Sequence, residues 1–463
     1  MRHLIYVPVL GQVASGIWLA GREAAAIRKA GIAECDVALV EHNSYNSRHN
    51  RTILEQVATE HPGVHFYHVT PGLIADLIVP HLATIADSPT AARIYTILAP
   101  HDSAYGAGPN KAALFAAAHG YDALHRRDAD LVDPGPAVDY RSFPLYNEVR
   151  SLGRRARDVL SPDEVKDEPW ADELVWMSGT SPRGDLPLDR RDLMEVDPSF
   201  VVELRALESS HPDLAASAKF VQSYFTESDF PELEREYPEP HLRMRIADRR
   251  PGHRIEVCVA SYAAAWKLLP QLPTRATITA DYVVYDLLRC IGSPVIRHDA
   301  APEHRYIPER LQRSEAWMID YGLRDVRQML LNRLWSEQRV RFRQAIGTAP
   351  QSIYQDGLIP AYVQAFTEVR NSERQTLTDM RHAIRDVYRR AIKHHHPKTD
   401  DQVQRRLTTL ASGIDSAGQS LVDDVLAGVD DFTVLTEHWP ALLESLAKSD
   451  SSPCQLVPAS PRR

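Results

Sequence analysis

The feature that most constrains the fold is the regular alternation of strand-like and helix-like segments over the first 135 residues. Short apolar runs such as HLIYVPVL (3–10) and DVALVEHNS (36–44) alternate with runs of helical periodicity such as SGIWLAGREAAAIRKAGI (15–32). Strands that alternate with helices pair in parallel through right-handed crossovers. The pattern therefore predicts an α/β fold with a Rossmann-like, mostly parallel sheet flanked by helices.

Polar segments follow three of the predicted strands. They are EHNS (41–44), a turn at 68–71, and HRRDAD (125–130). In an open parallel sheet, ligands bind outside the carboxyl ends of the strands. We therefore expect these three segments to gather at one edge of the sheet and to contact the ligand.

The HRRDAD segment ends in two carboxylates, Asp128 and Asp130, at i, i+2 spacing. At a strand end this spacing places both on one face, about 6–7 Å apart, and just beyond it they can converge on one cation. Carboxylate oxygens suit Mg²⁺ or Mn²⁺, which also bind substrate phosphates. A D-x-D is weak evidence by itself, because most are solvated turns. Asn110 and Lys111, which open the preceding helix, add backbone N–H groups and a cation suited to phosphate oxygens.

Arg126 and Arg127 lie where a buried parallel strand is normally apolar. Two guanidinium groups are costly to bury unless they are paired or face a ligand. Two interpretations stay open. Either the strand is at a sheet edge and its arginines are solvated, or they contact Asp128, Asp130 or a bound diphosphate.

Taken in order, these segments resemble the nucleotide-binding domain of GT-A glycosyltransferases of the family-2 type. In that superfamily the first strand ends in a proline-containing turn, the second ends in an acidic residue and a polar turn with Ser, and a helix bearing Lys or Arg leads to D-x-D. The matching positions here are Pro8, Glu41, Asn43, Ser44, Lys111, Asp128 and Asp130. The resemblance implies that these residues, with Asn110, Arg126 and Arg127, bind a nucleoside diphosphate, and that Asp128 and Asp130 also bind the metal.

A second block, TADYVVYDLLRCIGSPVIRHDAAPEH (279–304), is similar to the acceptor-side segment of the same superfamily. There, a helix opens with an acidic residue that often acts as general base, and a downstream histidine can complete the metal site. The resemblance implies that Asp281 is the base and His304 a metal ligand, with His298 as the other candidate histidine. The simpler interpretation of Asp281 is helix capping beside Thr279, and at least one histidine is then an ordinary surface or core residue.

Three departures limit the resemblance. The His-Arg-Arg run (125–127) ahead of D-x-D is unusual for an apolar core strand. The second-strand turn is Glu41-His42-Asn43, where the superfamily usually has two acidic residues or Asp followed by Asn or Asp, so the nucleobase stays open. The Q-x-x-R-W motif of the processive synthases is absent from the sequence, which argues against a processive polysaccharide synthase.

We expect four parts along the chain: a nucleotide-binding half (1–135), an acceptor-side half (136–311), a helical region (312–450) and a disordered tail (451–463). The helical region is expected to pack onto the catalytic domain or to form a homodimer. Asp185, Asp189 and Arg190 are expected to contact the acceptor.

Composition limits the class of protein. A net charge of −9 argues against a general nucleic-acid-binding protein, and the sequence has no apolar run long enough to cross a membrane. The four cysteines form no CxxC pair, so neither a disulfide framework nor a cysteine zinc site is expected. The first residues, MRHLIYVPVLGQ, lack a small-residue cleavage site and predict a strand rather than a signal peptide. We therefore expect a cytoplasmic protein.

Together these features predict a metal-dependent, inverting glycosyltransferase. It would move a sugar from a nucleotide-diphosphate donor to a small-molecule or peptide-like acceptor, with Mn²⁺ or Mg²⁺ as cofactor. Two alternatives stay open. One is an enzyme of the same fold with another activated donor, for nucleotidyl transfer or for amide or ester formation. The other is a non-catalytic binding protein of that fold.

Overall fold

The computed structural model describes residues 1–13, 15–43, 45–99, 105–135, 138–184, 190–208, 244–247, 255–274, 277–278, 280–305, 314–347, 351–394 and 401–449. At its centre is an eight-stranded sheet in the order β3-β2-β1-β4-β8-β5-β9-β7. Its strands are β1 (His3–Val9), β2 (Cys35–Glu41), β3 (Phe66–Val69), β4 (Ala123–Arg126), β5 (Met177–Gly179), β7 (Met244–Ile246), β8 (Ala260–Ala263) and β9 (Val295–His298). A second, two-stranded sheet pairs β6 (Arg183–Gly184) with β10 (Glu303–His304).

The sheet is mixed. β3, β2, β1 and β4 are parallel, as predicted, and so are β5 and β9. However, β8 is antiparallel to both β4 and β5, and β7 is antiparallel to β9. The prediction of a mostly parallel sheet is therefore wrong beyond β4. Strand direction depends on the route of the connecting segments, which the apolar pattern of a short strand such as β8 does not encode.

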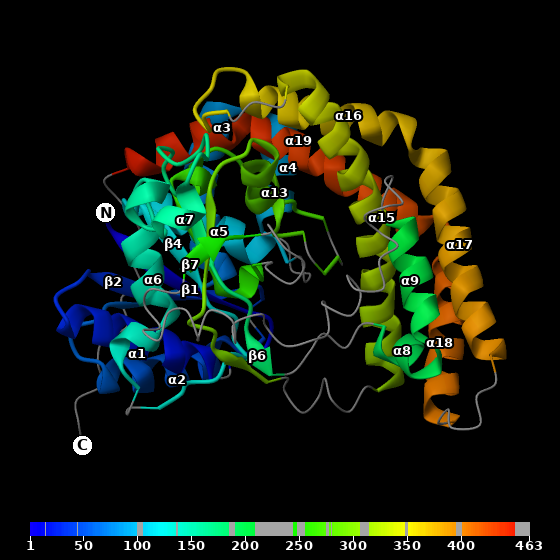
Figure 1. The fold of residues 1–463 in the computed structure, drawn as a ribbon, viewed down its shortest axis with the longest axis horizontal. Coiled ribbons are helices and arrows are strands. Elements are labelled where there is room, and N and C mark those ends of the chain that lie inside the picture. The colour runs from blue at the N-terminus through cyan, green and yellow to red at the C-terminus, as the bar shows by residue number, and fades with distance from the viewer. Residues whose placement is uncertain are drawn as a thin grey trace.

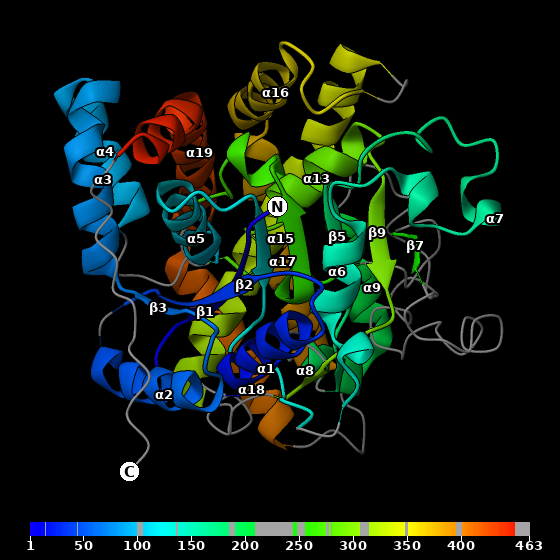
Figure 2. The same ribbon diagram turned by 90° about the vertical axis from the view of Figure 1, so that its left-hand side faces the viewer.

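Helices cover both faces of the sheet (Figure 2). The side chains of β1 alternate between them, with Ile5 and Val7 in one core and Leu4 and Tyr6 in the other. The first core is closed by α1 (Gly16–Lys29), α2 (Ser47–Glu60) and α6 (Pro144–Ser151). The second is closed by α3 (Pro71–Ile85), α4 (Ser88–Leu98), α5 (Ala107–Ala118) and α13 (Val283–Cys290).

The C-terminal region is helical, as predicted. It comprises α15 (Glu315–Ile346), α16 (Leu358–Ser372), α17 (Arg374–Lys393), α18 (Asp401–Ala417) and α19 (Ser420–Ala447). In Figure 1, α19 extends from these helices to the side of the sheet, where it packs on α3, α4 and α5. Shorter elements are α7 (Pro162–Val165), α8 (Arg191–Val196), α9 (Pro198–Leu207), η1 (Tyr140–Ser142), η2 (Ala156–Asp158), η4 (Val257–Val259) and η5 (Ala265–Lys267). Of the helices that the structure describes, none has the length and apolarity needed to cross a membrane.

The sheet and the C-terminal helices share one continuous apolar core. Trp439 of α19 is fully buried, and its Nε1–H donates to the Trp266 carbonyl at 3.1 Å. Buried Asp286 of α13 pairs with Arg339 of α15 and accepts a hydrogen bond from the Tyr362 hydroxyl of α16 at 3.0 Å. These contacts attach the helical region to the sheet rather than leaving it as a separate unit.

We expect Trp439→Ala to destabilise the whole chain, because it opens a cavity in this shared core. Loss of a buried Trp costs about 3–5 kcal/mol. Urea unfolding followed by far-UV circular dichroism and by tryptophan fluorescence should show one coincident transition at a lower midpoint. Tyr45→Ala, at a side chain that is 88% exposed, is the control and should leave the midpoint nearly unchanged. Two separate transitions in the wild type would contradict a shared core.

Candidate functional site

The D-x-D segment is fixed on two sides by backbone hydrogen bonds. The Asp128 N–H donates to the Cys258 carbonyl at 3.2 Å, and the Gly16 N–H donates to the Ala129 carbonyl at 2.9 Å. A Cβ at Gly16 would lie 2.1 Å from the Asp128 carbonyl oxygen, so only glycine allows α1 to begin this close. The start of α1 therefore sets the path of the chain after β4.

The same segment is paired with β10, which brings His304 to Asp130. The Val132 N–H donates to the Glu303 carbonyl at 2.8 Å, and the Arg305 N–H donates to the Asp130 carbonyl at 3.1 Å. His304 Nε2 lies 3.2 Å from Asp130 Oδ2, and the two side chains are 12% and 13% exposed. Two of the residues predicted to share a metal site are thus neighbours, although they are far apart in sequence.

The Asp130 carboxylate suits Mg²⁺ or Mn²⁺, whereas the His304 imidazole favours a transition metal such as Mn²⁺ over Mg²⁺. Asp128 Oδ1 accepts a hydrogen bond from Arg126 Nε at 2.7 Å, so this oxygen is engaged within the protein. Within the described ranges, no group of three or more His, Cys, Asp and Glu side chains is arranged to hold a metal. Protein sites for Mg²⁺ often use only one or two carboxylates and leave the other positions to phosphates and water. Asp130 and His304 therefore fit a metal that is shared with a phosphate ligand.

Arg126 joins the D-x-D segment to the acceptor side. Its Nε donates to Asp128, and its Nη1 pairs with Asp281 Oδ2. Burial opposes the charge on Arg126, but Asp128 and Asp281 outweigh it and raise the pKa of Arg126 well above its usual value. Burial also raises the pKa of Asp281, with Arg126 acting in the opposite direction. The predicted contact between Arg126 and Asp128 is present.

Asp281 lies in a turn ahead of α13, which begins two residues later at Val283. The proposed N-cap, Thr279, is outside the described residues. The Asp281 side chain is only 2% exposed and is held by Arg126. Its assignment as general base stays a prediction.

Lys111 fixes the turn after β2. It is fully buried, and its Nζ donates to the carbonyls of His42 at 3.2 Å and Glu41 at 3.4 Å. Burial lowers the pKa of Lys111 to about 8, although Glu41 acts to raise it. Burial, helped by the charges of Lys111 and Arg126, lowers the pKa of His42 to about 3, so His42 is neutral near pH 7.

Glu41 is enclosed by polar side chains. Its Oε1 accepts a hydrogen bond from Asn50 Nδ2 at 2.8 Å and lies 3.0 Å from His68 Nε2. Burial acts to raise the pKa of Glu41, but hydrogen bonds from His68 and Asn50 lower it overall. Asn43 closes a local turn by accepting the Tyr45 N–H at 3.2 Å. Ser44 lies outside the described residues.

Asn110 and Pro8 serve the packing of α5. The Asn110 amide donates to the Gln271 carbonyl at 2.9 Å and accepts the Gln271 N–H at 2.7 Å. It is 2% exposed, so in this arrangement its side chain is used to hold the 271 segment rather than to contact phosphate. Pro8 lies against the start of α5, where a Cβ at Gly108 would come within 2.9 Å of the Pro8 Cβ.

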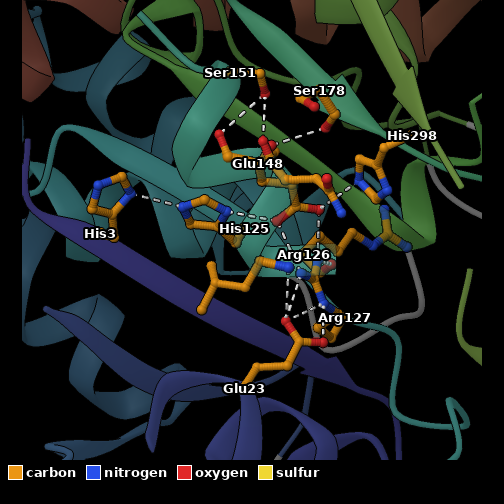
Figure 3. Close-up of polar contacts among 12 residues, drawn as sticks. His3, Glu23, His125, Arg126, Arg127, Glu148, Ser151, Ser178 and His298 are labelled. Carbon is orange, nitrogen blue, oxygen red and sulfur yellow. Dashed lines mark hydrogen bonds and ion pairs between the residues drawn. The ribbon is translucent and has the colours of Figure 1, made fainter. Parts of the chain in front are cut away.

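Arg127 is fully buried and points toward Glu23 and Glu148 (Figure 3). Its guanidinium donates to Glu23 of α1 and to Glu148 of α6 over 2.8–3.1 Å. All three side chains are fully buried. Burial opposes the charge on Arg127, but Glu148 and Glu23 outweigh it and raise its pKa. Arg127 is therefore neither solvated nor directed at a diphosphate, and the structure gives no support to its predicted ligand contact.

A chain of histidines extends this buried network. His125 Nδ1 lies 2.8 Å from Glu148 Oε2, and His3 Nδ1 lies 3.0 Å from His125 Nε2. An ionised carboxylate can only accept, so His125 Nδ1–H donates to Glu148 and His3 Nδ1–H donates to His125. Burial raises the pKa of Glu148, but Arg127 and His125 outweigh it and lower the pKa well below its usual value. His298 also belongs here, with Nε2 3.8 Å from Glu148 Oε1, which leaves His304 as the histidine at the D-x-D segment.

The predicted acceptor contacts are placed only in part. Asp185 and Asp189 lie outside the described residues. Arg190 is buried and pairs with Asp325 of α15 and with Glu208. In this arrangement Arg190 attaches α8 and α9 to the C-terminal helices.

Sequence analysis missed a carboxylate on the acceptor side, Glu256. It is partly exposed, it accepts a hydrogen bond from the Tyr282 hydroxyl, and it lies two residues before Cys258, which binds the Asp128 N–H. No motif marks it, because it lies in an irregular segment ahead of β8. Glu23 did carry a signal, since it is four residues from both Leu19 and Ile27 on the apolar face of its helix.

The model of the DUF6271 family, described as a family of unknown function, matches residues 6–454. The match spans the sheet and the C-terminal helices together. A search of curated proteins found no match.

Because the pKa of buried His3 is lowered, we predict that the free energy of unfolding decreases as the pH is lowered from 7. Burial, then the neighbouring His125, lowers the pKa of His3 from 6.5 to about 3. Below pH 6.5 the unfolded chain therefore binds a proton that folded His3 does not, and stability declines until about pH 3. One such histidine removes about 2 kcal/mol of stability between pH 7 and pH 5.

Urea unfolding at pH 7 and pH 5 measures this effect. His3→Gln keeps a side-chain N–H donor but does not titrate, so its free energy of unfolding should fall by about 2 kcal/mol less than that of the wild type. His49→Gln, at an exposed position of α2, is the matched control. The same pH dependence in His3→Gln and in the wild type would show that His3 does not stay neutral.

Proposed function

The chain belongs to the DUF6271 family, and we propose that it is a metal-dependent glycosyltransferase that uses a nucleoside diphosphate sugar. The observation that carries this proposal is the pair of Asp130 and His304. These residues come from two segments that only the sequence resemblance had connected. They lie at the carboxyl edge of the parallel strands, where open α/β sheets bind their ligands.

Asp130 and His304 would hold the metal. Asp128 lies two residues before Asp130, and its carboxylate is oriented by the hydrogen bond from Arg126. A bound Mg²⁺ or Mn²⁺ would supply positive charge to offset the charge on the leaving diphosphate. The chain itself contributes a fixed edge: the start of α1 and β10 position the D-x-D segment, and Lys111 positions the turn after β2.

The acceptor would approach from the side formed by the described residues 255–274 and 280–305. Transfer requires a carboxylate that takes a proton from the acceptor hydroxyl or amine while that group attacks the anomeric carbon. A single displacement of this kind inverts the anomeric configuration. Asp281 and Glu256 are candidates on this side. Asp281 is joined to Asp128 through Arg126, and Glu256 lies two residues before Cys258, whose carbonyl accepts the Asp128 N–H.

A thermal-shift panel tests the donor site. Nucleoside diphosphates and sugar nucleotides, each with and without Mn²⁺, are added to the wild type and to Asp130→Ala. A ligand at 100 times its Kd adds about 2.7 kcal/mol to stability, so the correct nucleotide should raise the Tm only when Mn²⁺ is present. The rise should disappear in Asp130→Ala.

Asp158→Ala, at an exposed carboxylate in η2, is the control and should keep the full rise. If no nucleotide shifts the Tm of the wild type with Mn²⁺, the glycosyltransferase proposal fails. A metal-dependent shift that nucleoside triphosphates produce and sugar nucleotides do not would instead favour nucleotidyl transfer.

A further inference from the structure

We infer that Asp281 is a positioning residue, which acts on Asp128 through Arg126, and is not the general base. This inference rests on the proposed function, because it concerns how the carboxylates of the D-x-D segment are prepared for a metal. It assigns to Asp281 a role different from the one that the superfamily resemblance implies.

The three side chains form one line of ion pairs. Arg126 lies in the middle, with Nε on Asp128 Oδ1 at 2.7 Å and Nη1 on Asp281 Oδ2. The side chains of Arg126 and Asp281 are 5% and 2% exposed, whereas that of Asp128 is 24% exposed. The line therefore runs from a buried anchor, Asp281, to a carboxylate that reaches the surface.

The anchor is itself rigidly supported. The Ala280 carbonyl accepts the Leu272 N–H at 3.1 Å, and the Gln271 side chain accepts the Val283 N–H at 2.9 Å. Gln271 is in turn held by Asn110 through two hydrogen bonds. Hydrogen bonds thus hold the backbone on both sides of Asp281, so its position beside Arg126 is fixed by the fold.

A general base must reach the proton that it takes. Asp281 is almost without solvent contact, and it faces a guanidinium that stays charged at all working pH values. To act on an acceptor it would have to give up its buried ion pair with Arg126, which is unfavourable even though Asp128 would remain as a partner of the guanidinium. As a partner of Arg126 it needs no movement.

The electrostatic consequence concerns the metal. With Asp281 present, two carboxylates face one guanidinium, so this line carries a net negative charge beside Asp130. Without Asp281 the line would be neutral, and Arg126 would bind Asp128 alone. Both changes disfavour a cation at the D-x-D segment.

Titration with MnCl₂, followed by the electron paramagnetic resonance signal of free Mn²⁺, tests the inference in the wild type, Asp281→Asn and Asp286→Asn. Loss of a group that supports a metal site typically weakens binding about 10–100-fold, and we expect a loss in this range for Asp281→Asn. Asp286→Asn is the matched control. It removes an equally buried carboxylate that pairs with Arg339, away from Arg126, and should bind Mn²⁺ as the wild type does.

The double variant Arg126→Gln/Asp281→Asn separates positioning from general loss of structure. Because it removes the charge of Arg126 together with that of Asp281, it leaves Asp128 negative and no longer bound by the guanidinium. It should therefore recover a large part of the Mn²⁺ affinity that Asp281→Asn loses. If Asp281→Asn binds Mn²⁺ as tightly as the wild type does, the inference is overturned, and general base is again the role expected for Asp281. The absence of Mn²⁺ binding in the wild type would instead refute the proposed function.

If Asp281→Asn does not fold, Arg126→Lys supplies the test. A single ammonium cannot hold both carboxylates in the geometry of the guanidinium fork. The inference expects weaker Mn²⁺ binding in this variant, and unchanged binding would overturn it.

Discussion

A guanidinium group without solvent contact must be neutralised by groups that the fold brings to it, and Arg127 imposes this requirement here. Its partners are Glu23 on α1 and Glu148 on α6 (Figure 3). Removal of one partner from such a buried pair typically costs about 3–5 kcal/mol, because the other charge is left alone. The network can therefore form only when both helices are docked on this face of the sheet. Since α1 also fixes the D-x-D segment at Gly16, the site depends on the same docking.

The two neighbouring arginines have opposite surroundings because side chains at a strand end alternate between the faces of the sheet. His125 and Arg127 face α1 and α6, where they build the buried network. Arg126 and Asp128 lie on the other side, where they meet Asp281. In this short segment, His125 and Arg127 thus stabilise the core, whereas the alternate residues Arg126 and Asp128 belong to the candidate site. This explains why charged residues occupy positions that the apolar pattern reserves for core side chains.

The parts of this structure that sequence could predict are those with local patterns. Alternating periodicity predicted the parallel strands from β3 to β4 and the C-terminal helices, and ordered motifs connected Asp130 with His304. The contacts of the Arg127 and Asn110 side chains could not be predicted in this way. Their partners, Glu148 and Gln271, lie in segments without a distinctive pattern, and only the tertiary fold brings them into contact. The antiparallel direction of β8 was missed for a related reason, since it follows from the path of the connections.

The distribution of charge supports the proposal that the protein depends on a metal. The cations that sequence analysis expected to meet a diphosphate are already engaged: Arg126 and Arg127 each face two carboxylates, and Lys111 donates to backbone carbonyls. Of the residues that the sequence predicted at this edge, those that remain in reach of a ligand are negative, namely Asp130 and the partly exposed side of Asp128. A free diphosphate would be repelled by these carboxylates, whereas a divalent cation would be attracted. Under the proposed function, we therefore expect the metal to bind before or together with the diphosphate, because Arg126, Arg127 and Lys111 are committed to holding the site in shape.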